Sequence, residues 1–252
     1  MRPTALFLLA VSALAQNPAP PAFEVASVKI NHDPSGQYHQ EIAPASVSMR
    51  NVTLKILVAW AYHVQRPAIV GPAWFDDQRY DILAKAGWPA KEDEMRPMMV
   101  TLLAERFHLA VHRETREMEV MAFVEPKGGH KVTPSQVEGE PQVSDSPGGG
   151  KLIKGVALME LAEDVSHDVA MPVLDMTGLK GRFDFTFNPQ KYLAAARASV
   201  MADPQHRPSE AELRVTVMQD LIAGDTGLRL EARRAPVELV VVDRCDKAPV
   251  EN

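Results

Sequence analysis

Runs of alternating and helically spaced apolar residues cover most of the chain and predict a mixture of strands and helices. Residues 23–29 alternate apolar and polar side chains as a half-buried strand does. Residues 54–64 place apolar side chains on one broad helical face. Around that helix, the predicted elements are strands at 46–50, 69–70 and 79–84, a helix at 94–107, and a hairpin that joins 109–111 to 120–124 through a turn at 114–117. The first half therefore has the predicted order β-α-β-β-α-β-β.

Six short blocks of the stretch 51–124 recur in the same order between residues 155 and 243. One such pair is RYDI at 79–82 and RFDF at 182–185. The offset is 103 to 105 residues for the first three pairs and 119 to 121 for the last three, so one insertion in the second copy accounts for the difference. We therefore expect an α+β fold of two tandem β-α-β-β-α-β-β modules. As a fold-level analogy only, the pattern is similar to the short amino-terminal domains of secretins and TonB receptors.

The amino terminus has the pattern of an export signal, which we assign to residues 1–15. Arg2 supplies the positive charge, residues 5–13 form the apolar core, and Ala13-Leu14-Ala15 fits the cleavage rule. No other run approaches the roughly 18 apolar residues that a membrane span needs. We expect a periplasmic or secreted chain with no transmembrane segment after signal cleavage.

The repeat and the glycine and proline content together predict the domain boundaries. The expected units are a first αβ module with its amino-terminal strand at 16–126, a flexible linker at 127–150, and a second module at 151–252 with an insertion at about 188–214. The formal net charge of -6 argues against nucleic acid as a partner. Cys245 is the only cysteine, so no internal disulfide can form and packing must stabilise the fold.

Several motifs resemble a family of uncharacterised secreted proteins abundant in soil acidobacteria. They are FEVASVK at 23–29, NVTL at 51–54, GPAW at 71–74, LLAERFHLAVHRET at 102–115, VLDMTGLKGRFDF at 173–185 and PVEN at 249–252. The resemblance implies no established activity. Similar domains are attached to BlaR-type membrane metallopeptidases, which implies an extracytoplasmic sensing or binding role and a membrane sensor peptidase as one partner. This chain departs from those fusions because it carries no peptidase segment.

The most functional-looking cluster is Arg106, His112 and Glu114. Because His112 and Glu114 lie two residues apart on a predicted strand, both would point to the same face. With His108 they could form a metal site, although zinc sites usually need three or four well-supported ligands. A salt-bridged surface hairpin is the simpler interpretation. Trp74 would be either an exposed stacking platform or a side chain packed on the sheet.

These patterns favour a non-enzymatic binding or sensor module over an enzyme. Its partner would be an envelope component or a protein, and we expect no metal and no cofactor. The alternative is an extracytoplasmic hydrolase that uses the face of Arg106, His112 and Glu114. A buried His112 in a cleft would favour the hydrolase, and an exposed strand edge would favour the binder.

Overall fold

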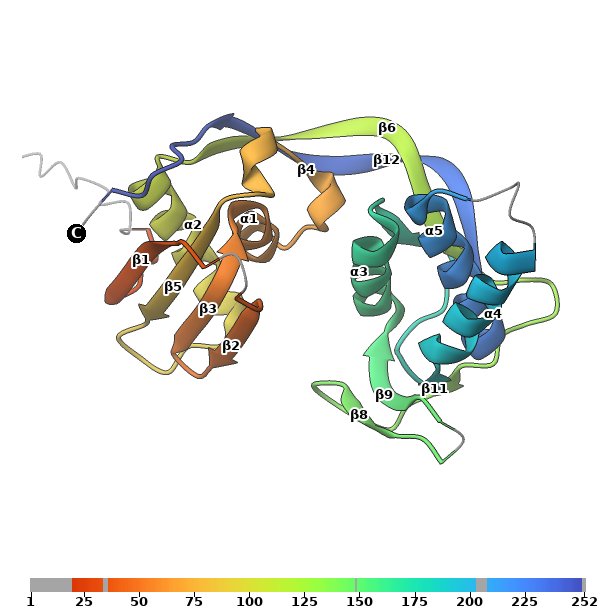
Figure 1. Cartoon of the computed structure of the whole chain (residues 1–252). Coiled ribbons are helices and arrows are strands. Elements are labelled where there is room, and N and C mark those ends of the chain that lie inside the picture. Colours follow the sequence, from red (N-terminus) through yellow and green to blue (C-terminus); the bar gives the residue numbers. More distant parts are fainter. Residues whose placement is uncertain (1–19, 34–35, 148, 203–207, 251–252) are drawn as a thin grey trace, which may run out of the picture.

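The computed structural model describes residues 20–33, 36–147, 149–202 and 208–250, with two lobes joined by a long two-stranded ribbon (Figure 1). The expected export signal at 1–15 lies outside the described residues. The elements, in chain order, are β1 (Val25–Asn31), β2 (His39–Ala43), β3 (Ser46–Thr53), α1 (Leu54–Tyr62), η1 (Arg66–Ala68), β4 (Ile69–Val70), η2 (Ala73–Phe75), β5 (Arg79–Lys85), α2 (Glu92–Phe107), β6 (Ala110–Val124), β7 (Thr133–Pro134), β8 (Gln142–Asp145), β9 (Lys151–Ala157), α3 (Leu158–Val169), β10 (Val173–Asp175), β11 (Arg182–Phe187), α4 (Pro189–Ala202), α5 (Glu210–Leu221), η3 (Ile222–Thr226) and β12 (Arg229–Arg244). The fold is α+β, as the sequence predicts.

The first lobe is an antiparallel sheet in the order β1-β5-β3-β2, with α1 and α2 against one face (Figure 1). Alternating residues of β3 and β5 are buried because every second side chain points toward those helices. Thr53 caps α1, since its hydroxyl accepts a hydrogen bond from the backbone N–H of Ile56 at 3.3 Å. The helix ends at His63, which adopts a left-handed conformation with φ of 52°.

The second lobe contains a sheet in the order β7-β11-β9-β8 together with α3, α4 and α5 (Figure 1). Its strands β7 and β8 come from the segment 127–150, and α4 lies within the expected insertion at 188–214. Strands β6 and β12 run along both lobes. The domain boundaries and the flexibility of the linker stay predictions.

The ribbon is the main difference from the expected fold. Strands β6 and β12 pair antiparallel without interruption from Arg229↔Val124 to Val242↔Val111. The predicted turn at 114–117 lies in the middle of β6, opposite residues 236–239, so the expected hairpin of 109–111 with 120–124 is wrong. In the second half, the pattern at 228–231 and 237–242 predicts a closing hairpin of the same kind. This prediction is also wrong, because both stretches belong to the single strand β12. Residues 114–117 look like a turn in the sequence because the side chains in this part of β6 are exposed or half-exposed and therefore charged or polar.

Two short strands attach the lobes to the ribbon. Strand β4 of the first half pairs parallel with β12, Ile69 opposite Val240. Strand β10 of the second half pairs parallel with β6, Val173 opposite Met121. Each half therefore contributes a short strand that pairs with the long strand of the other half.

The two halves share a local backbone feature. Asn51 in β3 and Gly155 in β9 both adopt left-handed conformations, with φ of 53° and 72°. The backbone N–H of Asn51 donates to Asp81 Oδ1 at 2.9 Å, and that of Gly155 donates to Asp184 Oδ1 at 2.9 Å. A register shift of the strand pairing accompanies each position. Within the described residues, no helix combines the length and apolar content needed to cross a membrane.

Candidate functional site

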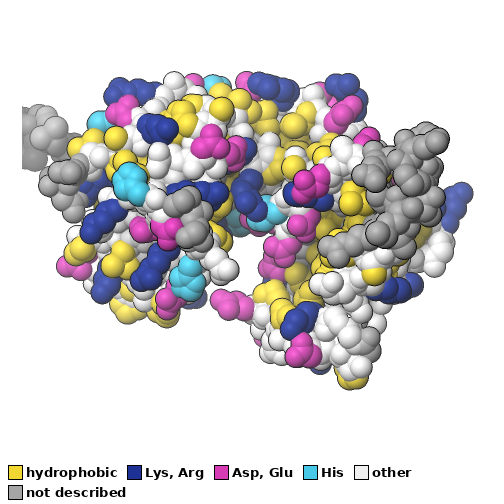
Figure 2. Space-filling view, in the orientation of Figure 1, with side chains coloured by type: hydrophobic (Ala, Val, Ile, Leu, Met, Phe, Trp, Pro, Cys, Tyr) yellow, Lys and Arg dark blue, Asp and Glu magenta, His cyan; other side chains and the backbone are white. Residues whose placement is uncertain are grey.

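A cleft of about 490 Å³ lies where the two lobes meet beneath the ribbon. Its lining residues come from both lobes and are Tyr38, Gln40, Ile56, Ala59, Trp60, Arg66, Arg79, Glu92, Arg96, Glu163 and His167. Figure 2 shows basic, acidic and histidine side chains gathered at the junction of the lobes. Residues far apart in the sequence thus form one polar site with an apolar floor.

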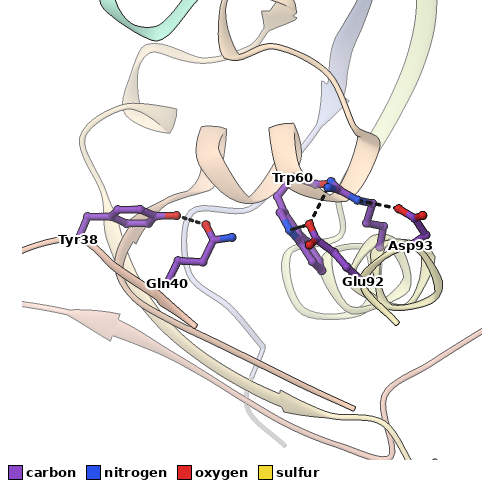
Figure 3. A network of polar contacts seen from close by, with 6 residues as sticks. Tyr38, Gln40, Trp60, Glu92 and Asp93 are labelled. Carbon is purple, nitrogen blue, oxygen red and sulfur yellow. Dashed lines mark hydrogen bonds and ion pairs between the residues drawn. The ribbon is translucent and has the colours of Figure 1, made fainter. Parts of the chain in front are cut away.

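A network of α1 and α2 side chains builds one wall of the cleft (Figure 3). The indole Nε1 of Trp60 donates to Glu92 Oε1 at 2.9 Å. The Arg96 guanidinium donates to the same carboxylate oxygen at 2.6 Å and lies over the Trp60 ring, 5.2 Å from its centroid. Asp93 lies 3.7 Å from Arg96 as a second acidic neighbour. The positive charge of Arg96 is therefore neutralised inside the protein, and its role here is to hold the wall.

Tyr38 and Gln40 form the rim at the edge strand β2. The Tyr38 hydroxyl donates to Gln40 Oε1, and the two side chains lie apart from the Trp60 network (Figure 3). Burial raises the pKa of the Tyr38 phenol, and the nearby Arg66 guanidinium opposes that shift. Tyr38 remains 45% exposed, so its ring is accessible to a ligand.

Arg66 and Arg79 are half-buried cations without a carboxylate partner in the part of the chain that the structure describes. Among the residues that the structure describes, the Arg66 guanidinium takes part in no hydrogen bond and no ion pair; only its backbone carbonyl accepts, from the N–H of Ile69. Arg79 forms no described ion pair either, and its Nη1 donates to the carbonyl oxygen of Asn51 at 3.4 Å. A partly desolvated cation without a counter-charge is costly, so these two side chains suit an anion.

The chain positions Arg66 through the residue before it. The Gln65 side-chain amide donates to the carbonyl oxygen of Val173 at 2.7 Å and accepts from its N–H at 2.8 Å. Pro67 follows Arg66 and lies inside the short helix η1, where its fixed φ is compatible with the turn. Arg66 is thereby fixed between the first lobe and β10 of the second half.

Helix α3 supplies the opposite wall through Glu163 and His167, which lie one turn apart and so face the same side. Desolvation by the cleft walls, and then the charge of Arg66, lower the pKa of the His167 imidazole to about 4. At neutral pH this ring is uncharged, so it can donate one hydrogen bond and accept another. The second wall therefore offers one carboxylate and one neutral imidazole.

The residues singled out from the sequence lie elsewhere. His112 and Glu114 are both on β6, but they have separate partners. His112 Nδ1 lies 2.8 Å from Asp243 Oδ1, and Glu114 accepts a hydrogen bond from Arg116. The side chain of His112 is 50% exposed, so the buried histidine that would favour a hydrolase is not present at this position.

Arg106 and Trp74 are also outside the cleft. Arg106 at the end of α2 holds the carboxy-terminal segment, because its carbonyl accepts from the N–H of Val250 at 2.7 Å and its Nη1 donates to the Val250 carbonyl at 3.3 Å. Trp74 is half-buried and packs edge-on against Phe75, with centroids 4.8 Å apart. Within the described part of the chain, no group of three or more His, Cys, Asp or Glu residues is placed to hold a metal ion.

Sequence reasoning missed Arg66, Arg79 and Arg96 because no motif spacing joins them. One signal was available in the repeated block. RYDI at 79–82 and RFDF at 182–185 both begin with arginine, so the environments of Arg79 and Arg182 could have been compared.

Comparison with known proteins identifies a family but no characterised relative. A family model described as "Protein of unknown function (DUF3738)" matches residues 55–245. No curated protein and no solved structure matches the chain.

Proposed function

The chain belongs to this DUF3738 family of unknown function, and we propose that it is an extracytoplasmic binding or sensor module that holds its ligand in the cleft between the two lobes. One observation carries the proposal: the cleft is lined from both lobes and contains two arginines that form no ion pair with any carboxylate of the described residues. A concave site with an apolar floor and a few convergent polar groups is the usual form of a small-molecule site.

The two walls differ in a way that favours binding over catalysis. The first wall presents Arg66 and Arg79, and the second presents Glu163 and a neutral His167. None of these side chains forms a hydrogen bond to another in the described part of the chain, so no nucleophile is paired with a base there. The cleft offers charge and hydrogen bonds, which are the requirements of recognition.

The tandem-repeat interpretation of the fold explains how this cleft could form, as the space between two copies of one module. From β3 to β6 and from β9 to β12, each half has the order strand, helix, strand, strand, helix, strand, apart from the inserted α4. Two strands precede this order in each half, β1 and β2 in the first and β7 and β8 in the second, and the two sheets have matching strand orders. The pairing of Ile69 with Val240 and of Val173 with Met121 supports two copies related by an approximate twofold axis through the ribbon. A duplicated scaffold of this kind places unlike walls, one from each copy, face to face. The order has one strand fewer per copy than the expected module.

The setting of the module is part of the same proposal. The pattern of residues 1–15 supports export, and the resemblance to domains attached to BlaR-type peptidases supports a sensing role beside a membrane protein partner. The ligand would then be a compound of the periplasm or the surroundings, and the bound state would be reported to an envelope partner.

A thermal-shift screen of the purified mature chain tests the proposal. The panel contains amino acids, short peptides, sugars, organic acids and phosphorylated metabolites. A ligand that binds the folded state raises the melting temperature by mass action, with about 2.7 kcal/mol of stabilisation at a hundredfold excess over Kd. A ligand that binds in the cleft no longer raises the melting temperature of the variant His167→Trp, because the larger side chain on α3 fills the cleft.

The control is Met159→Trp, on the same helix but 74% exposed and outside the cleft. It adds the same side chain without blocking the site, so its melting shifts match those of the unmodified chain. Hits that persist unchanged in His167→Trp, or a panel that stabilises none of the three proteins, would count against a binding cleft.

A further inference from the structure

The second lobe contains a complete version of an arginine site that is incomplete in the first. Arg182 donates from Nη1 and Nη2 to the two carboxylate oxygens of Glu160, at 3.1 and 3.0 Å. Its Nε also donates to the carbonyl oxygen of Gly155. Glu160 is the third residue of α3, and its carboxylate accepts in addition from the N–H of Ala157. The guanidinium is therefore held by one backbone oxygen and one bidentate carboxylate.

At the corresponding positions of the first lobe, the arginine is present but the carboxylate is replaced by an apolar residue. Arg79 begins β5 as Arg182 begins β11, and it donates to the carbonyl of Asn51, the left-handed residue that matches Gly155. The third residue of α1 is Ile56, where α3 has Glu160. Both Ile56 and Arg79 line the cleft, so the position of the missing carboxylate opens into it.

We propose that the ligand of the cleft is an oxyanion, a carboxylate or a phosphate, which binds Arg79 in the place that Glu160 takes beside Arg182. This inference rests on the proposed binding function of the cleft and specifies the chemical class of its ligand. A guanidinium fork matches the geometry of both oxyanions, and either would replace the bidentate partner that Arg79 lacks.

Other residues of the cleft limit the ligand further. Arg66 supplies a second cation without an ion-pair partner among the described residues. Glu163 faces the same space and repels a second negative charge, so a ligand with one anionic group at the Arg79 end is favoured. Ile56 and Ala59 provide apolar contact for an organic body next to that group.

Calorimetric titration of the mature chain tests the inference with four probes: acetate, succinate, inorganic phosphate and acetamide. Acetamide has the size of acetate without its charge. We expect saturable binding of at least one oxyanion probe and none of acetamide. Separate titrations of acetate, succinate and phosphate show whether the site favours carboxylate or phosphate.

The decisive variant is Ile56→Glu, which supplies the carboxylate from within the chain and occupies Arg79. We expect it to weaken the oxyanion by about 10- to 100-fold, the effect of one charge-assisted contact. Ile56→Gln has nearly the same shape without the charge, and it controls for any loss of packing by leaving the affinity nearly unchanged. Arg66→Gln weakens the same probes, whereas the exposed Arg244→Gln does not.

Three results would overturn the inference. The first is that acetamide binds as well as acetate, and the second is that Ile56→Glu and Ile56→Gln bind the oxyanion probes with equal affinity. The third is that no oxyanion probe binds saturably at millimolar concentration. Its failure is distinguishable from failure of the binding function. Neutral compounds whose stabilisation disappears in His167→Trp would preserve the cleft as a binding site and remove only the oxyanion. Melting shifts that are equal in His167→Trp and in the unmodified chain would refute the cleft as a binding site.

Discussion

Gln65 fixes the contact between the two halves of the chain, and its replacement by alanine should cost substantial stability. Its side chain makes two hydrogen bonds to the backbone of Val173, at 2.7 and 2.8 Å, and Val173 is only 1% exposed. Gln65→Ala leaves a buried N–H and a buried carbonyl without their side-chain partner. An orphaned buried polar group costs about 1–3 kcal/mol. Because Gln65 itself is only half-buried, water can replace part of the loss, and for the two groups together we expect about 2–4 kcal/mol.

Urea unfolding followed by circular dichroism measures this loss. For a chain of this size, each kcal/mol lowers the melting temperature by roughly 2–4 °C, so heating gives an independent value. Gln190→Ala is the matched control, because Gln190 is exposed at the start of α4. A loss below about 0.5 kcal/mol for Gln65→Ala, within the range of ordinary surface substitutions, would refute the claim that these bonds hold the halves together.

Three further predictions concern the cleft, the ribbon and the strand irregularity. The depressed pKa of His167 means that the unfolded chain binds its proton first, so stability falls as the pH drops from about 6.5 to about 4; in His167→Asn the urea midpoint falls less over that window. Leu239 on β12 is 1% exposed in an apolar cluster on the ribbon, so Leu239→Ala costs about 2–5 kcal/mol by urea unfolding, and a loss under 1 kcal/mol would mean that the ribbon lacks a core of its own. Asp184 accepts the N–H of Gly155, so Asp184→Ala costs about 1–3 kcal/mol and speeds amide exchange at Gly155; unchanged exchange there would contradict the role of this carboxylate.

Local sequence patterns predicted the elements that are amphipathic over a full length. The helical face at 54–64 corresponds to α1 (Leu54–Tyr62), and the predicted helix at 94–107 corresponds to α2 (Glu92–Phe107). The predicted strand at 79–84 corresponds to β5 (Arg79–Lys85). In each case one face packs on a core, so the apolar period is present in the sequence.

The ribbon and the cleft could not be predicted in the same way. Most side chains at 112–119 are exposed or half-exposed, so that part of β6 carries the charges that are typical of a turn. The cleft depends on the pairing of β4 and β10 with the ribbon, and these strands are two and three residues long. Such short strands have no period, although their pairing decides that Arg66 and His167 line the same cleft.

The most direct test of an oxyanion in the cleft is a spectrum of the arginine Nε–H groups during titration with acetate, the singly charged probe. The account predicts that the resonances of Arg79 and Arg66 move and saturate together, because both side chains line the cleft and neither is paired with a carboxylate of the described residues. Arg182 is the internal control, since Glu160 already occupies its guanidinium and its resonance stays in place. Resonances of Arg79 and Arg66 that stay fixed at millimolar acetate, or that move no more than the Arg182 resonance, would contradict the account.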